Sequence, residues 1–182
     1  MNSLPVVASV HLSPVHKFSK PAQLGIRLLQ GLGVEGDAHC GATVQHRYDK
    51  SRRPTSPNLR QVHLIQGELL DELQAEGFRV HPGELGENLS TRGIDLTALP
   101  TGTRLLLGDE AVVELTGLRN PCVYIERFQA GLLARMRIKP TGSRFSARAG
   151  VMGVVVRGGH VVAGDAIAVE HPSEPWRALK PV

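Results

Sequence analysis

The sequence predicts a mainly β fold with a few helices, built around a curved, barrel-like sheet. Short stretches of alternating or β-branched residues recur along the chain, whereas apolar residues at helical spacing occur in only two or three places. Turns containing glycine or proline separate these stretches, as is typical of closely connected short strands. The chain has 182 residues, 41% of them hydrophobic, so one domain over residues 1–182 with a buried core is expected.

The first sixty residues are predicted to hold one strand and a long loop. Residues 6–12 alternate loosely around Val, His and Leu, and Pro14 ends this strand. Residues 17–37 combine leucine pairs typical of a helical turn with four glycines, so helix and loop both stay open. Residues 39–59 have almost no apolar periodicity and are predicted to run over the surface, where loops often carry function.

The remaining elements follow the same patterns. Residues 60–66 alternate as a strand, and residues 67–77 place leucines at helical spacing before a glycine, which predicts a short helix. Residues 151–156 and 161–169 flank a Gly-Gly pair and are predicted to form a hairpin followed by another strand. Further strands are expected over residues 87–91, 103–107 and 111–117.

Composition narrows the classes of function. Lys and Arg number 21 against 17 for Asp and Glu, and this net charge of +4 suits an anionic ligand without indicating nucleic acid. No apolar run is long enough to span a bilayer and the first ten residues lack a signal-peptide pattern, so a cytoplasmic protein without membrane contact is expected. Two cysteines, Cys40 and Cys122, are too few for a disulfide framework, and each is free, buried, catalytic or a metal ligand.

Cys122 follows a pattern that predicts an activated thiol. Asn120 is a good N-cap and Pro121 suits the first position of a helix, which Gly131 would end. Cys122 would then lie in the first turn, where the helix dipole and Arg119 favour a thiolate, either nucleophile or soft-metal ligand. The alternative is a small buried residue that fills the junction between strand and helix.

Two further clusters carry weaker patterns. Asp37, His39, Cys40, His46 and His63 are residue types that bind zinc, but their spacing matches no strong zinc motif, and a glycine-flanked polar turn is favoured. Residues 82–93 place glycines around a Glu-Asn pair. Such a turn exposes backbone N–H groups to an anion, although a plain turn between strands is the more frequent outcome.

Five motifs taken in order resemble the MOSC domain, which is found at the C-terminus of molybdenum cofactor sulfurases. They lie at residues 33–39, 60–65, 83–89, 118–122 and 164–165, and the resemblance covers about residues 30–170. It implies a β-rich, barrel-like fold with a few helices. Members such as the mitochondrial amidoxime-reducing component and the bacterial YiiM-type proteins bind molybdenum cofactor and reduce N-hydroxylated compounds, which implies the same cofactor here.

The resemblance also assigns roles to residues of this chain. Cys122 would ligate molybdenum, and Arg119 would hold the anionic groups of the cofactor or stabilise the thiolate. The donors to the pterin or its phosphate would be Asn88, Ser90 and Thr91. The residues lining the substrate side, as part of the catalytic set, would be Asp37, His39 and His63.

The functional expectation is thus a molybdenum-dependent oxidoreductase for N-hydroxylated or N-oxide compounds, supplied with electrons by an unidentified reductase. The cofactor would carry the redox chemistry and the protein a ligand and a pocket. One alternative is a non-catalytic module that binds or carries molybdenum cofactor or sulfur. A zinc protein using His39, Cys40 and His46 is the other.

Overall fold

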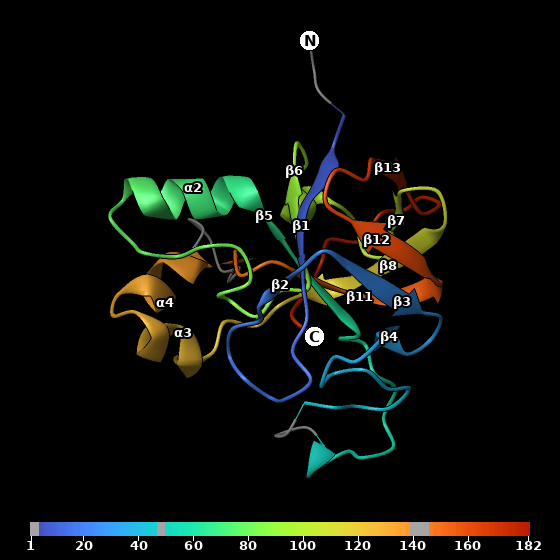
Figure 1. Ribbon diagram of the computed structural model, residues 1–182, viewed down its shortest axis with the longest axis horizontal. Coiled ribbons are helices and arrows are strands. Elements are labelled where there is room, and N and C mark those ends of the chain that lie inside the picture. Colours follow the sequence, from blue (N-terminus) through green and yellow to red (C-terminus); the bar gives the residue numbers. More distant parts are fainter. Residues whose placement is uncertain (1–3, 47–49, 139–145) are drawn as a thin grey trace.

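The computed structural model describes residues 4–46, 50–138 and 146–182. Three α-helices in this part of the chain gather to one side of the strands (Figure 1). The helices are α2 (Gly67–Ala75), α3 (Val123–Phe128) and α4 (Leu132–Met136), with a 3-10 turn η1 (Leu96–Ala98). The strands are β1 (Val6–His11), β2 (Ala22–Gln23), β3 (Gly25–Leu29), β4 (Gly33–Val34), β5 (Val62–Gln66), β6 (Leu89–Arg92), β7 (Arg104–Leu107), β8 (Ala111–Leu118), β9 (Arg137–Ile138), β10 (Ser146–Ala147), β11 (Val151–Arg157), β12 (Gly159–Val162) and β13 (Ile167–Glu170).

The main sheet is strongly curved, as the sequence predicts. Its eight strands run in the order β13-β7-β8-β11-β5-β6-β1-β2, and only β5 and β6 are parallel. The sheet is not closed by a continuous ladder. Near the start of β1, however, Val7 N–H donates to the Asp165 carbonyl and Gly164 N–H to the Val7 carbonyl, both at 2.8 Å. These bonds bring β1 against the turn before β13 and give the sheet its barrel-like shape.

Most predicted elements are confirmed. The strands expected over residues 6–12, 60–66, 87–91, 103–107 and 111–117 are β1, β5, β6, β7 and β8, and the expected helix is α2. The unassigned segment 17–37 holds the short strands β2, β3 and β4. In the described part of residues 39–59, the Thr43–Pro57 bridge is the strand-like pairing recorded, consistent with a long loop.

The prediction that residues 151–156 and 161–169 form a hairpin is wrong. Strand β11 pairs with β5 and β8, while β12 pairs with β3 in a separate three-stranded sheet. Gly158, between β11 and β12, and Gly159, the first residue of β12, allow a close crossing of chains instead of forming a tight turn. A Cβ at Gly158 would lie 2.8 Å from the Leu28 carbonyl oxygen, and one at Gly159 would lie 2.8 Å from the Ala111 nitrogen.

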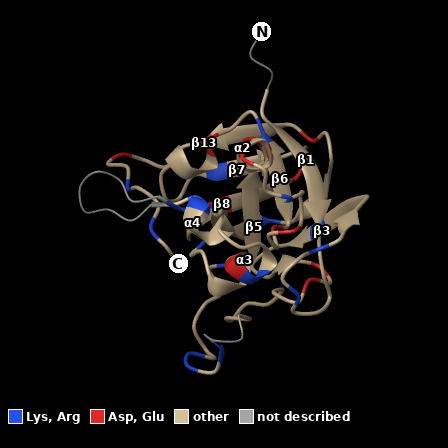
Figure 2. Ribbon diagram, turned by 90° about the vertical axis from the view of Figure 1, so that its left-hand side faces the viewer, with Lys and Arg blue, Asp and Glu red and all other residues tan. Residues whose placement is uncertain are grey.

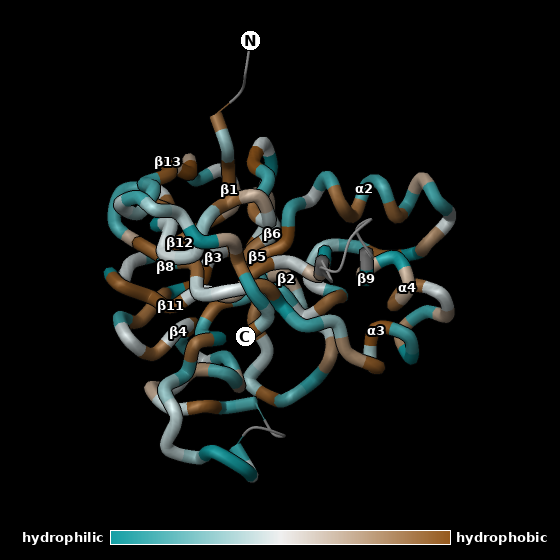
Figure 3. The backbone as a smooth tube through the Cα atoms, turned by 180° about the vertical axis from the view of Figure 1, so that it is seen from behind, coloured by the Kyte–Doolittle hydropathy of each residue, from teal (hydrophilic) through white to brown (hydrophobic). Residues whose placement is uncertain are grey.

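Two apolar cores lie on either side of β5. Leu64 belongs to the core enclosed by the curved sheet, and Ile65 belongs to the core between the sheet and the helices. Helix α2 supplies the second core with Leu69, Leu70 and Leu73, and Figure 3 shows its alternation of hydrophobic and hydrophilic residues. Because the side chains of a strand alternate between faces, β5 links the two cores, and the polar His63 shares the face of Ile65, toward the helices.

Charged residues of both signs are interspersed along the ribbon (Figure 2). Across the described ranges, helices are too short or too polar to cross a bilayer.

Candidate functional site

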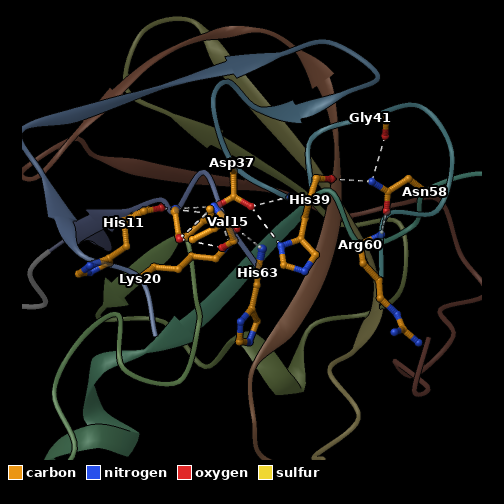
Figure 4. A network of polar contacts seen from close by, with 11 residues as sticks. His11, Val15, Lys20, Asp37, His39, Gly41, Asn58, Arg60 and His63 are labelled. Carbon is orange, nitrogen blue, oxygen red and sulfur yellow. Dashed lines mark hydrogen bonds and ion pairs between the residues drawn. The ribbon is translucent and has the colours of Figure 1, made fainter. Parts of the chain in front are cut away.

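A buried carboxylate, Asp37, is the centre of a polar network between the loop after β4 and the loop after β1 (Figure 4). Its Oδ2 accepts hydrogen bonds from Lys20 Nζ at 2.7 Å, from Asn88 Nδ2 at 3.1 Å and from the Ser13 N–H at 3.2 Å. Its Oδ1 accepts from the N–H and the ring Nδ1 of His39, at 2.9 and 3.1 Å. Both oxygens are therefore occupied by groups of the protein itself.

The charged groups of this network stabilise one another's ionised forms. Burial raises the pKa of Asp37, but the hydrogen bonds from His39 and the charge of Lys20 outweigh it and hold that pKa well below its ordinary value. Burial lowers the pKa of Lys20, and the ion pair with Asp37 opposes this. Asp37 is thus a permanent anion that fixes the position of the His39 ring.

Asn88 joins β1 to β5 through its side chain. Its Nδ2 also donates to the His11 carbonyl at 3.1 Å, and its Oδ1 accepts from the His63 N–H at 3.2 Å. Only 2% of the surface of Asn88 is exposed, and its side chain bonds to groups of the protein itself. Ser90 and Thr91, the other two predicted cofactor donors, have no exposed surface. All three predicted donors therefore lie where a ligand would reach them only if the structure opened.

His63 is buried beside the same network. Its Nε2 donates to the Ala149 carbonyl at 2.8 Å. Burial, and then the charge of Arg119, lower the pKa of His63 well below its ordinary value, so the ring is neutral near pH 7. The structure thus places His63 among the site residues, but beneath the surface.

The glycine-rich turn after α2 holds an anion that belongs to the chain itself. The Gly83 N–H donates to Glu87 Oε1 at 2.5 Å, and the Ser90 hydroxyl donates to the same oxygen at 3.2 Å. Gly83 has a φ of 87°, and a Cβ there would lie 2.4 Å from the Lys20 carbonyl oxygen. The turn was expected to offer N–H groups to an external anion. Such an anion would have to compete with Glu87, which already accepts the Gly83 N–H.

Arg119 follows the last residue of β8 and has an unused donor. Its backbone N–H donates to the Gly150 carbonyl at 2.9 Å, and its guanidinium lies 5.9 Å from the centre of the Phe18 ring. Nη1 is buried and has no hydrogen-bond partner among the described residues. Burial lowers the pKa of Arg119, and electrostatic interactions with Cys122 and Glu87 oppose this. A buried guanidinium with a free N–H suits an anionic ligand.

Cys122 lies half-buried three residues after Arg119. The helix predicted to begin at Pro121 begins instead at Val123, and Cys122 itself is the N-cap, in extended conformation with φ −114° and ψ 168°. Pro121 is buried and lies outside the helix, and its carbonyl accepts a hydrogen bond from Arg137 Nη2 at 3.4 Å.

The expected helix is also divided. It ends at Phe128, and Gly131, in a left-handed conformation, is the N-cap of the separate helix α4. The first-turn and dipole argument for Cys122 is therefore wrong in this form, since α3 has only six residues and starts after the cysteine. Arg119, three residues before Cys122, remains as the nearest cation in sequence.

The zinc alternative has no geometric support. Within residues 4–46, 50–138 and 146–182, no group of three or more His, Cys, Asp and Glu side chains is placed to hold a metal ion. Cys40 is half-buried, and burial, with the charges of Asp37 and Glu35, raises its pKa, which favours the neutral thiol over a metal-binding thiolate.

Sequence reasoning missed three buried ionisable residues of the site. They are His11, Lys20 and Glu87. Glu87 stands inside the recognised glycine-rich motif, so its charge beside closely spaced glycines was a usable signal. Lys20 and His11 lie in segments without a motif, and only the tertiary structure brings them to Asp37 and Glu87.

Comparisons with known proteins agree on one family. The model of the MOSC domain matches residues 36–168. The Bacillus subtilis protein YuaD, whose name refers to metal-sulfur cluster biosynthesis, is 29% identical over 150 residues, which are 75% of this chain and 76% of YuaD.

Solved structures show the same fold. The crystal structure of YuaD superposes with a TM-score of 0.75 at 24% identity, over 94% of this chain and 98% of YuaD. YiiM from Geobacillus stearothermophilus gives a TM-score of 0.65 at 14% identity, over 96% of this chain and 79% of YiiM. YiiM from Escherichia coli gives 0.62 at 21% identity, over 96% and 74%. The sequence motifs, the curved sheet and these matches lead to one conclusion: the chain belongs to the MOSC domain family.

Proposed function

We propose that the protein binds molybdenum cofactor, with the Cys122 thiolate as a ligand of the metal and Arg119 as a contact of the cofactor's anionic group. We further propose that the loaded protein reduces N-hydroxylated or N-oxide compounds with electrons from a separate reductase. The observation that carries the proposal is the buried Nη1 of Arg119, which has no partner among the described residues and lies three residues before the half-buried Cys122.

The residues present fit such a group. A buried guanidinium N–H without a partner is costly, and an anionic ligand would offset that cost with a charge-assisted hydrogen bond. A thiolate is a soft ligand that suits molybdenum, and Arg119 is the cation whose charge acts on Cys122. Val123 and Tyr124, which are 52% and 55% exposed, adjoin the cysteine and offer apolar surface to an organic ligand.

When bound, the cofactor would supply a metal that changes oxidation state and accepts oxygen from an N–O bond. The residues of this chain would bind and orient. Arg119, whose guanidinium lies 5.9 Å from the centre of the Phe18 ring, would hold the anionic group. Asp37 accepts a hydrogen bond from Nδ1 of His39, so in the neutral ring Nε2 would be the nitrogen that accepts a hydrogen bond or a proton from a bound ligand. The Lys20–Asp37 ion pair would keep that ring in place.

A second candidate function is a carrier of molybdenum cofactor or sulfur without turnover. The partial exposure of Cys122 supports it, because a carrier must expose its loaded group to a partner. The name of YuaD, which refers to metal-sulfur cluster biosynthesis, points in the same direction.

The test begins with metal and pterin analysis of protein produced in a host that makes molybdenum cofactor. The proposal expects about one molybdenum and one pterin per chain in wild type, and loss of activity with an altered metal–sulfur signature in Cys122→Ala. Unchanged metal–sulfur coordination in Cys122→Ala would show that another residue is the ligand. Turnover of an N-hydroxylated substrate by loaded wild type separates the reductase from the carrier.

A further inference from the structure

The two carboxylate oxygens of Glu87 have unequal surroundings. The residue has no exposed surface, and Oε1 accepts both the Gly83 N–H and the Ser90 hydroxyl. Oε2 is buried and has no hydrogen-bond partner in the described part of the chain. Ionised Glu87 therefore retains an uncompensated desolvation cost.

Two cations, Lys20 and Arg119, interact electrostatically with Glu87. The Nζ of Lys20 is already held by Asp37 at 2.7 Å. Arg119 and Glu87 shift one another's pKa through their charges, yet no hydrogen bond joins them among the described residues. A free acceptor, Oε2, and a free donor, Nη1, are thus buried in one electrostatic environment, and Glu87 is the carboxylate that balances Arg119.

The other titratable groups around Glu87 are the imidazoles of His11 and His63. The ring of His11 lies against Gly83, since a Cβ on that glycine would be 2.5 Å from His11 Nδ1. Burial lowers the pKa of both histidines, so both are neutral near pH 7. The buried charged residues that remain are Lys20, Asp37 and Glu87, and the half-buried Arg119 contributes its buried Nη1.

We propose that Glu87 is a proton-linked positioning residue of the anion site: when an anion binds Arg119, the Glu87 carboxylate takes up one proton from solvent and becomes a neutral carboxylic acid. No electron is transferred. The negative charge that balances Arg119 is then carried by the bound anion instead of by Glu87. The proposal rests on the part of the proposed function that makes Arg119 an anion contact.

The physical reason is repulsion between two anions that share one guanidinium in a poorly solvated interior. Because burial already raises the pKa of Glu87, neutralising it requires less free energy than neutralising an exposed glutamate. Linkage is reciprocal, so an anion that promotes protonation of Glu87 must bind more weakly as pH rises. One coupled proton corresponds to a change of about tenfold in the dissociation constant per pH unit within the active window.

Sulfate is a clean probe, because it stays a dianion across the useful pH range. Titration calorimetry of cofactor-free wild type with sulfate, from about pH 5 to about pH 8 in two buffers of different ionisation enthalpy, counts the protons taken up. We expect uptake approaching one proton per sulfate in wild type. Glu87→Gln should still bind sulfate, without that uptake and with a dissociation constant that no longer depends on pH.

Two further variants define the result. Glu84→Gln removes the same charge from the same turn, where Glu84 accepts the His81 N–H near the surface, and should behave as wild type. Ser90→Ala removes a hydrogen bond that lowers the pKa of Glu87, so the pH window should move upward, which tests the proposal even if Glu87→Gln folds poorly.

Proton uptake that persists in Glu87→Gln would overturn the proposal in favour of a histidine, and sulfate binding without uptake in wild type would also overturn it. Equal sulfate binding by wild type and Arg119→Gln would exclude Arg119 as the anion contact and overturn it together with that part of the proposed function. Coupled sulfate binding by a protein that never contains molybdenum or pterin would support Glu87 and refute the cofactor.

Discussion

Lys20 Nζ lies 2.7 Å from Asp37 Oδ2, and only 4% and 2% of the two side chains is exposed. This ion pair joins the loop after β1 to the loop after β4, and Asn88 attaches the same oxygen to the segment entering β6. Three segments distant in sequence therefore meet at one carboxylate. The position of His39, and with it the outer side of the candidate site, depends on this contact.

Replacement of Asp37 by Ala should destabilise the protein strongly. It leaves Lys20 as a buried cation without its partner, and breaking one half of a buried pair costs about 3–5 kcal/mol. Urea unfolding followed by circular dichroism measures the effect, with the exposed Glu35→Ala as control. A loss below about 1 kcal/mol would mean that water reaches Lys20.

The double variant Lys20→Met with Asp37→Leu should be more stable than either single variant. Removing both charges removes both desolvation costs, and the apolar side chains fill the space. The free energies of unfolding of the two single variants and the double variant give the coupling energy. Additive losses would contradict a direct interaction between the two side chains.

The unfolding free energy should fall as pH is lowered below about 6.5, the ordinary pKa of histidine. The pKa of buried His63 is lowered in the folded protein, so the unfolded chain binds a proton at a pH where the native state does not. The slope per group reaches at most about 1.4 kcal/mol per pH unit.

His63→Gln should flatten this profile, while His160→Gln, at an exposed position on β12, should leave it unchanged. Some slope will remain in His63→Gln because burial also lowers the pKa of His11. Urea unfolding at a series of pH values measures the slope. A profile for His63→Gln identical to that of wild type would show that His63 is not the titrating group.

Arg119→Lys should weaken retention of the cofactor although the charge is kept. Lysine cannot reproduce the fork of N–H donors of the guanidinium, and loss of one charge-assisted hydrogen bond costs about 1.5–3 kcal/mol, or about one to two powers of ten in affinity. Pterin and molybdenum content after dialysis measures retention, with the exposed Arg104→Lys as control. If Arg119→Lys and Arg119→Ala both retain the cofactor as wild type does, Arg119 lies outside the site.

Cys40→Ser should fold normally and keep its molybdenum. The raised pKa of Cys40 keeps its thiol protonated, and no cluster of metal-binding side chains surrounds it in the described ranges. Elemental analysis of wild type and variant measures this directly. One zinc per chain in wild type that disappears in Cys40→Ser would instead support the zinc alternative.

The sequence by itself determined the fold class, most strands and the family. Leucines at helical spacing over residues 67–77 are a local pattern that α2 retains, because the helix buries the face that its periodicity defines. Alternation over residues 60–66 correctly predicts the strand β5, although residues 62–65 are buried on both faces, between the two cores. The ordered glycine-containing motifs identified the MOSC domain for a related reason. Glycines mark positions where only a residue without Cβ fits, as at Gly83 against the Lys20 carbonyl.

Tertiary structure alone decided which strands pair and which polar residues meet. The Gly158-Gly159 pair fits a hairpin locally, but β12 pairs with β3 because the glycines let the chain cross Leu28 and Ala111 closely. Likewise, Pro121 suits a helix start, yet it is buried before the helix, and α3 begins only after Cys122. Four separate segments supply the charged residues Lys20, Asp37, Glu87 and Arg119. These residues meet only when the curved sheet brings their segments together, so local sequence periodicity cannot predict their contacts.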